Sequence, residues 1–391
     1  MGCKVVRIGD VAVFRKESVK PKAGVIYHCY SFPAFDNACT PEVMDGSKIL
    51  SSKFRFVAGD ILVNKLNMRF KRIWPIGDQL APNSVCSTEF IPLTPNENVD
   101  RNFLLYVLLS DSFTRKLSGM RTGTSGSHQR VKVDWILDYE FMLPDFTTQC
   151  KIGDILATID AKIALNGRIN DYLAETAVAL FNRECSQSNE PNAMLSDIAQ
   201  ITMGQSPSGS SYNEEGDGEV FYQGRAEFGA FFPRRRLFTT KPKRMAQEGD
   251  TLMSVRAPVG DLNIANENCC IGRGLAAIHS ENNQSFVHYL VRAQRRILNT
   301  FNGDGTVFGS INGKALKELP VFLPGNDVIA HLESQLKSID ELIRRNDDEM
   351  QALEQMRDTL LPRLMSGEID VSQIEVPKQL NNHLCDCLYV S

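Results

Sequence analysis

The sequence predicts an α+β protein in which two pseudo-symmetric α/β domains alternate with two long helices that form an antiparallel coiled coil. Three observations support this fold class: the chain repeats itself once, each repeat ends in a long helical heptad pattern, and the segments between are short strands and helices. With 391 residues, the chain also exceeds one compact domain. We expect domains at 1–146 and 191–325, helical spacers at 147–190 and 326–370, and a flexible tail at 371–391.

An internal repeat of long period relates the two halves of the chain. A shift of 180 residues places Ile159 and Asp160 on Ile339 and Asp340, and many further pairs match at the same offset. Nearer the N terminus the offset drifts to 190 and then to 187, which indicates loops of different length. A period this long excludes a solenoid and predicts two copies of one domain, each followed by one helix.

Both helices are predicted from apolar positions that alternate in steps of four and three. The first seam contains Ile152, Leu156, Ile159, Ile163, Asn166, Asn170, Leu173, Ala177 and Leu180, and the second contains Leu332, Leu336, Ile339, Ile343, Asn346, Met350, Leu353, Arg357 and Leu360. This spacing is typical of a coiled coil. Each helix of about 35 residues would be ~50 Å long at 1.5 Å per residue.

The ends of the helices have their own signals. Thr147 or Thr148 can cap the first helix, Asn326 can cap the second, and Pro362 or Gly367 ends the second.

A buried polar pair is expected where the two helices cross midway. Because a globular domain separates the helices along the chain, we expect them to pack antiparallel, and level ends would bring Asn166 to Asn346. Such a pair fixes register and orientation at some cost in stability. The alternative is that both side chains lie slightly off the seam and contact water.

The domains themselves are predicted to contain short strands and short helices. Apolar or alternating segments bounded by Gly, Pro, Asn or Asp indicate strands at Ile61 to Val63, Phe90 to Leu93, Glu219 to Tyr222, Gly274 to Ile278 and Leu319 to Leu323. Helices are expected from Phe103 to Leu117, after Asp100, and from Phe286 to Leu298, after Gln284.

The net charge of −4 argues against a nucleic-acid-binding protein, but its distribution does not. Counting Lys and Arg against Asp and Glu, the net charge is +4 for 1–146, −2 for 147–190, +1 for 191–325 and −7 for 326–391. The two domains carry dense basic clusters at Lys65, Arg69, Lys71 and Arg72, and at Arg234, Arg235, Arg236, Lys241, Lys243 and Arg244. These clusters are typical of phosphate contacts, and the alternative is an ordinary solvated face.

Cysteine usage and hydropathy indicate an intracellular, cytoplasmic protein without a membrane span. The ten cysteines form no C-x-x-C pair, which favours reduced thiols, and no apolar run approaches the roughly 18 residues of a span. We expect no metal site. His383, Cys385 and Cys387 are an alternative for metal binding, although a short polar tail is more often disordered.

Catalytic motifs are absent from the sequence. It contains no phosphate-binding P-loop, no H-E-x-x-H, no G-x-S-x-G, and no Asn-Pro-Pro-aromatic tetrapeptide of DNA amino-methyltransferases. Two rival classes remain: an enzyme with two pseudo-equivalent catalytic domains, and a coiled-coil scaffold that binds only proteins.

Polar loops punctuated by glycine supply groups that suit DNA. They occupy 123–130, 204–208, 222–225 and 303–310, and offer hydroxyls and backbone amides for phosphates together with Gln and Arg for base edges. The alternative is that they are plain turns.

These residues together resemble the specificity subunit of type I restriction-modification systems, over nearly the whole chain. The resemblance rests on Leu360 to Ile369, Leu195 to Ile198, Gly204 to Ser208, Ser254 to Asp261, Cys270 to Gly274, Gly59 to Leu62 and Ser87 to Phe90. The first domain is less similar than the second, and Ile329 stands at the position equivalent to Gln149.

The resemblance implies two target-recognition domains, each reading one half of a split DNA target, with the helices as a ruler between them. A rod of ~50 Å would span roughly 15 base pairs. The implied partners are double-stranded DNA, two methyltransferase subunits and restriction subunits. S-adenosylmethionine, ATP and Mg²⁺ are expected in those partners, with no cofactor and no catalytic activity in this chain alone.

Candidate DNA contacts follow from the polar and basic loops. In the first domain they are Lys65, Arg69, Arg72, Ser125, His128, Gln129 and Arg130; in the second they are Gln205, Ser206, Ser208, Tyr212, Gln223, Arg225, Arg234, Arg235, Arg256, Arg273 and Thr306. Among these we expect Arg225 to read a base and Lys65 to contact a phosphate.

Overall fold

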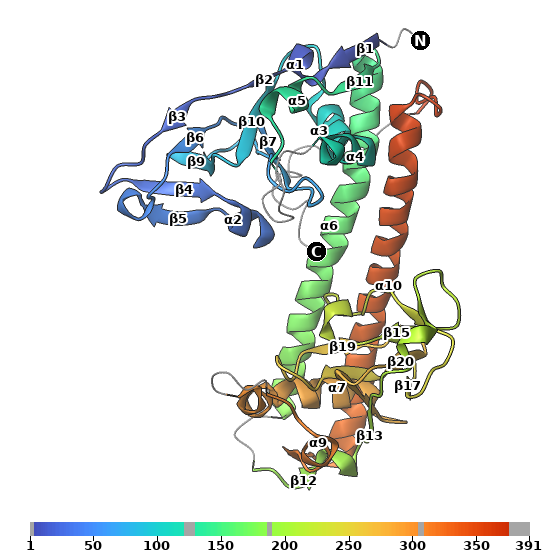
Figure 1. The fold of residues 1–391 in the computed structure, drawn as a ribbon. Helices are drawn as coiled ribbons and strands as arrows, with labels where there is room; N and C mark the ends of the chain where they lie inside the picture. Colours follow the sequence, from blue (N-terminus) through green and yellow to red (C-terminus); the bar gives the residue numbers. More distant parts are fainter. Residues whose placement is uncertain (1–3, 121–129, 186–189, 304–308, 375–391) are drawn as a thin grey trace. The chain divides into compact units, whose positions relative to one another are not determined.

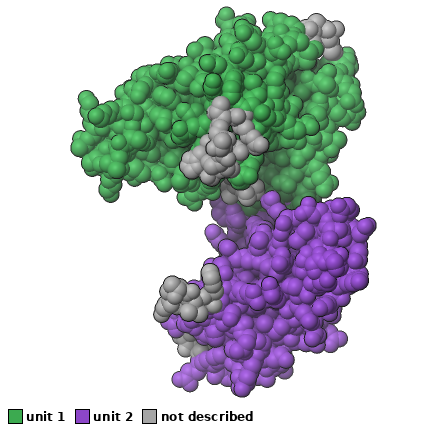
Figure 2. All heavy atoms as spheres, viewed as in Figure 1, with its two compact units in different colours: residues 1–168, 347–390 green, residues 169–346, 391 purple. Residues whose placement is uncertain are grey.

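The computed structural model describes residues 4–120, 130–185, 190–303 and 309–374. The chain divides into two compact units, shown in different colours in Figure 2. Unit 1 contains residues 1–168 and 347–390, and unit 2 contains 169–346. Each unit therefore holds one globular domain together with one part of each long helix.

Unit 1 is built from short strands and short helices that precede the first long helix (Figure 1). Its elements are β1 (Lys4–Arg7), α1 (Ile8–Val11), β2 (Ala12–Phe14), β3 (Ser18–Val19), β4 (Ile26–Tyr30), α2 (Phe32–Asp36), β5 (Glu42–Asp45), β6 (Lys53–Arg55), β7 (Ile61–Asn64), β8 (Ile73–Pro75), β9 (Ser84–Ser87), β10 (Phe90–Pro95), α3 (Arg101–Leu109), α4 (Asp111–Gly119), α5 (Val133–Leu137), β11 (Glu140–Leu143) and the first part of α6 (Phe146–Glu184).

The sheets of unit 1 are mostly antiparallel. One has the order β2-β10-β7-β8, a second has the order β3-β6-β9-β4-β5, and β1 pairs with β11. Within the second sheet, β4 and β9 run parallel. The main core lies between the first of these sheets and α3, and it also includes Leu361 and Leu364 from the last turns of the second long helix.

Unit 2 repeats this plan. Its elements are β12 (Ala193–Met194), β13 (Gln200–Met203), β14 (Tyr212–Asn213), β15 (Glu219–Tyr222), β16 (Phe238–Thr239), β17 (Met245–Ala246), β18 (Thr251–Ser254), β19 (Leu262–Ile264), β20 (Cys269–Ile271), β21 (Leu275–His279), α7 (Gln284–Ala293), α8 (Arg295–Asn299), α9 (Gly313–Lys317), β22 (Pro320–Val321) and the first part of α10 (Asn326–Met365).

The sheets of unit 2 correspond to those of unit 1. The order β13-β21-β18-β19 matches the four-stranded sheet, and β14-β16-β15-β20-β17 matches the five-stranded one, again with one parallel pair, β15 and β20. Its core includes Phe181 near the end of α6 and Leu332 and Leu336 from α10. The mixed helix and sheet content and the repeat confirm the predicted fold class.

The two long helices pack antiparallel in each unit (Figure 1). In unit 1, Arg357 Nη1 donates to Asp160 Oδ1 at 2.8 Å, and Asn166 Nδ2 donates to Glu349 Oε2 at 2.7 Å. In unit 2, the partner of Asn346 is Asn170, whose Oδ1 accepts its Nδ2 at 2.8 Å. The expected pairing of Asn166 with Asn346 is therefore wrong, and the register differs from it by one helical turn.

The asparagines lie in the seam rather than beside it. Asn166 and Asn170 are 1% and 0% exposed, so the alternative in which the first-helix asparagine contacts water is wrong. Asn170 Nδ2 also donates to the carbonyl of Ile343 at 3.1 Å, which satisfies both ends of its amide. Whether the asparagines fix the register stays a prediction.

The helix ends differ from expectation by one or two residues. Asp145 caps α6, since its carboxylate accepts from the amide and hydroxyl of Thr148 at 3.0 and 2.7 Å. Gly325 precedes α10 and accepts from Val328 at 2.9 Å, so Asn326 is the first helical residue. At the other end α10 passes through Pro362, and Gly367, at φ +74°, follows it as predicted.

Two predicted helices are each divided in two. Ser110 interrupts the first, because its Oγ accepts from the amide of Phe113 at 3.2 Å and starts α4. A residue that caps a new helix adopts extended backbone and ends the preceding one. The second divides at Gln294 into α7 and α8. The five strands expected from the sequence all occur, with ends shifted by at most two residues.

The described cysteines are free thiols, in agreement with the prediction of reduced thiols. Among the described residues, no helix combines the length and the apolar character that a bilayer span requires.

Candidate nucleic-acid interface

Strand direction brings four loops of unit 2 to one end of its sheets. β13 and β18 are both antiparallel to β21, so both end beside its first residue. β15 and β20 run parallel and end together at Tyr222 and Ile271. The loops that follow β13, β15, β18 and β20 therefore form one cluster, which we call the unit 2 loop cluster: residues 204–208, 223–230, 255–261 and 272–274.

Backbone hydrogen bonds connect these loops. Gly204 donates to the carbonyl of Leu275 at 2.9 Å, and Gly272 donates to that of Tyr222 at 2.8 Å. The hydroxyl of Ser206 accepts from the amide of Arg273 at 3.3 Å. The loops consequently form a connected surface, with their backbones positioned by the strands beneath.

Two glycines make this close approach possible. A Cβ on Gly204 would lie 2.2 Å from the carbonyl oxygen of Gly272, and a Cβ on Gly272 would lie 2.7 Å from that of Gln223. Both distances are shorter than van der Waals contact with rigid backbone. Packing between the loops therefore requires glycine at both of these positions.

Most predicted contact residues of unit 2 lie in this cluster. Gln205, Ser208, Gln223, Arg256 and Arg273 are exposed there.

Ser206 and Tyr212 are half-buried and form hydrogen bonds to other residues of unit 2. The Tyr212 hydroxyl donates to the carbonyl of Pro207 at 3.1 Å, and its ring lies 4.9 Å from that of Phe221. Tyr212 therefore supports the loop after β13.

Two of the predicted arginines of unit 2, Arg225 and Arg235, pair with carboxylates. Arg225, within the cluster, pairs with Asp261. Arg235 makes two hydrogen bonds to Glu267, at 2.5 and 2.8 Å, and this pairing raises its pKa. Arg234 is exposed, and its backbone amide donates to the carbonyl of Glu227 at 2.8 Å.

Unit 1 places two of its predicted residues in the equivalent arrangement. The amide of Val131 donates to the carbonyl of Lys65 at 2.8 Å, and an isolated bridge joins Leu66 to Arg130. In unit 2 an isolated bridge likewise joins Arg256 to Ser310. Lys65 and Arg130 therefore lie together at the end of β7.

The other predicted basic residues of unit 1, Arg69 and Arg72, lie against aromatic or acidic neighbours. Arg72 makes hydrogen bonds of 2.8 and 2.7 Å to the carboxylate of Asp36, and its guanidinium lies 5.0 Å from the centre of the Phe32 ring. Arg69 is exposed and lies 5.1 Å from the ring of Phe70. Ser125, His128, Gln129 and Thr306 lie outside the described residues.

Sequence reasoning missed the acidic partners of the predicted arginines. Asp36, Glu89, Asp261 and Glu267 hold Arg72, Arg130, Arg225 and Arg235, at sequence separations of 32 to 41 residues. It also missed Arg292 and Arg295, which line a pocket with Arg225. Local spacing carries no signal for such pairs, because the fold alone brings them together.

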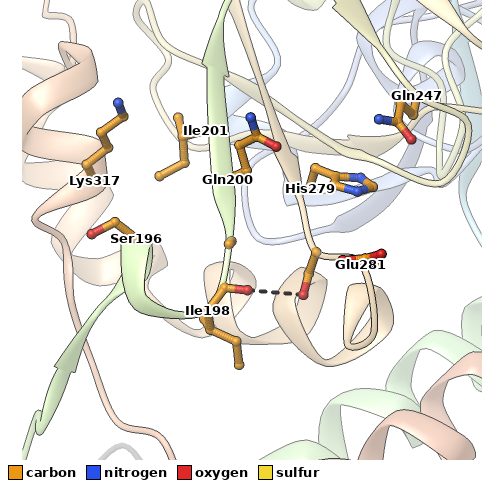
Figure 3. A pocket seen from close by; sticks show the side chains of 10 residues that line it. Ser196, Ile198, Gln200, Ile201, Gln247, His279, Glu281 and Lys317 are labelled. Atoms are coloured by element: carbon orange, nitrogen blue, oxygen red, sulfur yellow. Dashed lines mark hydrogen bonds between the residues drawn. The ribbon is translucent and has the colours of Figure 1, made fainter.

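A larger open hollow of about 950 Å³ lies at the opposite end of the four-stranded sheet of unit 2. Figure 3 shows Gln200 and Ile201 at the start of β13 and His279 at the end of β21 beside it. His279 Nδ1 is 2.7 Å from Asp250 Oδ1. Since the loop cluster lies at the other ends of these strands, this hollow is separate from the candidate interface.

Comparison with known proteins agrees with this arrangement. The family model for the type I restriction modification DNA specificity domain matches residues 2–175 and again 192–351. A type I restriction enzyme specificity subunit of Methanocaldococcus jannaschii is 30% identical over 348 residues, which cover 82% of this chain and 80% of that protein. The specificity subunit of the HindI enzyme of Haemophilus influenzae is 22% identical over 398 residues, with 80% and 86% covered.

A solved structure shows the same fold. The crystal structure of the type I restriction-modification S subunit from M. genitalium matches with a TM-score of 0.59 and 15% identity, covering 93% of this chain and 96% of that one.

The chain belongs to the type I restriction-modification DNA specificity family and is a specificity subunit with two target-recognition domains. The predicted resemblance is confirmed, and a scaffold that binds only proteins is not favoured.

Proposed function

We propose that each unit reads one half of a split DNA target through the loops at the end of its sheets. The observation that carries this proposal is the unit 2 loop cluster, in which four loops are fixed by strand ends and present Gln205, Gln223, Arg256 and Arg273 to solvent. Gln and Arg are the side chains that make paired hydrogen bonds to adenine and guanine in the major groove. In unit 1, Arg130 is the corresponding candidate for a base contact, and Lys65 beside it is the candidate for a phosphate contact.

The chain acts within a complex and contributes no catalytic group in this proposal. Two methyltransferase subunits dock on α6 and α10, restriction subunits join them, and S-adenosylmethionine, ATP and Mg²⁺ bind in those partners. Large apolar side chains exposed on the helices support docking, among them Tyr172 at 69% and Met356 at 51%. The helices set the distance between the two half-sites.

The test is modification-sensitive sequencing of the host genome with and without this gene. Deletion is expected to remove methylation from a motif of two short halves around a fixed gap. In a host that expresses Arg273→Gln, the sequence requirement of the methylated motif should relax at one position of one half only. The reason is that each base contact is worth about 1 to 3 kcal/mol. The matched control is Lys317→Gln, which removes a positive charge at the opposite hollow and should leave the motif unchanged.

An unchanged methylome after deletion, together with no salt-dependent binding of the purified full-length chain to DNA, would overturn the proposal. A changed sequence requirement in both halves of the motif for Arg273→Gln would contradict the assignment of one half-site to each unit.

A further inference from the structure

A pocket of about 490 Å³ lies beside the unit 2 loop cluster, between the loop after β15, the start of β19, and the helices α7 and α8. Three arginines line it, Arg225, Arg292 and Arg295, together with one carboxylate, Asp261. Arg225 Nε pairs with Asp261 Oδ2, and Arg295 Nη2 lies 3.5 Å from Asp261 Oδ1. The pocket thus has three guanidinium groups and one carboxylate, which pairs with two of them, so its net charge is positive by two.

The net positive charge of the pocket favours an anion over a base edge. Guanidinium groups only donate hydrogen bonds, and both oxygens of Asp261 already face guanidinium groups. The guanine edge that an arginine reads presents neutral acceptors, whereas a phosphodiester presents acceptors and a full negative charge. The side chains of Arg225 and Arg295 are 56% and 68% exposed, so both can reach a ligand from solution.

The position of the pocket indicates which phosphate it would take. Arg225 follows the exposed Gln223 by two residues, and Asp261 ends the loop that carries Arg256. The backbone amide of Asp261 donates to Ser254 Oγ at 2.9 Å, which fixes the carboxylate at the base of that loop. A duplex whose bases contact Gln223 and Arg256 would therefore bring its sugar-phosphate backbone against the pocket.

We propose that this pocket binds a backbone phosphate of the DNA beside the half-site read by unit 2, and that Asp261 holds Arg225 and Arg295 until the phosphate replaces it. This inference rests on the proposed function. It assigns Arg225 to the backbone, in place of the base contact expected from the sequence. Because Asp261 competes with every phosphate alike, it lowers the affinity for target and nonspecific DNA by the same factor and leaves the ratio between them unchanged.

The test measures binding of the full-length chain to two duplexes of equal length, one with the target motif and one scrambled, across a salt titration. Arg295→Gln and Arg292→Gln should each weaken both duplexes by the same factor, about three- to ten-fold. Each should also lower the slope of log affinity against log salt by ~0.9. Asp261→Asn should strengthen both duplexes and increase that slope.

Two control variants match these changes. Arg296→Gln alters the next residue of α8, which is exposed and does not line the pocket, and Glu281→Gln removes a carboxylate at the opposite hollow. Neither should change affinity by more than about two-fold. Asp261→Asn keeps the backbone hydrogen bonds of Asp261, and Arg295 is a surface residue, so circular dichroism should show folded variants.

The outcomes separate the two proposals. If the parent chain binds the target but Arg295→Gln behaves like Arg296→Gln, or Asp261→Asn weakens binding, the pocket is not a phosphate site and the proposed function stands. If Arg295→Gln weakens only the target duplex, Arg295 reads sequence and the assignment is wrong. If the parent chain shows no salt-dependent DNA affinity, both proposals fail.

Discussion

Pairing between arginines and carboxylates changes what the basic residues of this protein can do. Arg72, Arg130 and Arg235 have carboxylate partners within 2.8 Å. A guanidinium that has a carboxylate to itself has a fixed orientation and a largely neutralised charge, so it is better suited to reading a fixed hydrogen-bond pattern than to attracting any phosphate. Arg225 and Arg295 differ, because they share the one carboxylate of Asp261. Counting basic residues along the sequence therefore overstates the nonspecific attraction of these loops for DNA.

A buried histidine is expected to make unit 2 sensitive to acid. His288 on α7 is 7% exposed, and its Nδ1 is 3.2 Å from the hydroxyl of Thr251. Burial, with a smaller effect from the charge of Arg292, lowers the pKa of His288 to about 3. The unfolded chain takes up this proton near the ordinary value of 6.5, so stability is present above that pH and is lost as pH falls toward 3.

We expect unit 2 to lose about 2 kcal/mol of unfolding free energy between pH 6.5 and pH 5 through this histidine. The variant His288→Gln, which cannot be protonated, should lose less over the same range. Chemical denaturation followed by amide hydrogen exchange in α7 measures this difference. The control His331→Gln alters an exposed histidine of α10, and an equal effect there would refute the role of His288.

At the scale of elements, a tyrosine–aspartate hydrogen bond connects the domain to a long helix in both units, but the surroundings of the aspartate differ. A tyrosine of the domain helix donates to an aspartate of the long helix in both units: Tyr106 to Asp160 at 2.5 Å, and Tyr289 to Asp340 at 2.7 Å. In unit 1, Arg357 also pairs with Asp160 at 2.8 Å. In unit 2, burial raises the pKa of Asp340 to about 6.

The two aspartates are therefore expected to respond oppositely to the same substitution. The pKa of Asp340 is raised, so its contribution to stability is present below pH 3.8 and is lost as pH rises through about 6. Asp340→Asn should gain about 1 to 3 kcal/mol relative to the parent between pH 4 and pH 7. Asp160→Asn should instead destabilise unit 1 at neutral pH by about 1 to 3 kcal/mol, because Arg357 loses its carboxylate.

Denaturation of both variants at several pH values measures these changes. A gain for Asp160→Asn, or a loss for Asp340→Asn that grows with pH, would contradict them.

The long helices and the loops differ in how much of their structure could be predicted from the sequence. Heptad spacing predicted both long helices because apolar positions repeat over nearly thirty residues, from Ile152 to Leu180 and from Leu332 to Leu360. Their register was not predictable in this way, since Asn166 and Asn170 occupy consecutive core positions and spacing does not choose between them. The loop residues of the interface were predictable from glycine and polar side chains. Their carboxylate partners were not, because tertiary structure alone joins residues such as Arg225 and Asp261.

At the scale of the whole molecule, one helix serves the cores of both units. Leu336 of α10 is buried in the core of unit 2, and Leu364 of the same helix is buried in the core of unit 1. Leu364→Ala should destabilise unit 1 by about 2 to 5 kcal/mol and leave unit 2 intact. Hydrogen exchange should then rise in α3 and not in α7.

Leu336→Ala is the matched variant, and it should give the reverse pattern, with faster exchange in α7 and unchanged exchange in α3. Equal loss of protection in both units from either variant would show that they unfold as one cooperative body.

The division of the chain into units also fixes an order of events during synthesis. Unit 2 is continuous from 169 to 346, whereas the core of unit 1 needs Leu361 and Leu364 in addition to its N-terminal domain. At roughly 5 to 20 residues per second, about 10 to 40 seconds pass between the emergence of residue 168 and that of residue 364. The part of the protein that leaves the ribosome first is therefore the last to be completed, and until then the apolar side chains that Leu361 and Leu364 contact in the core lack these two partners.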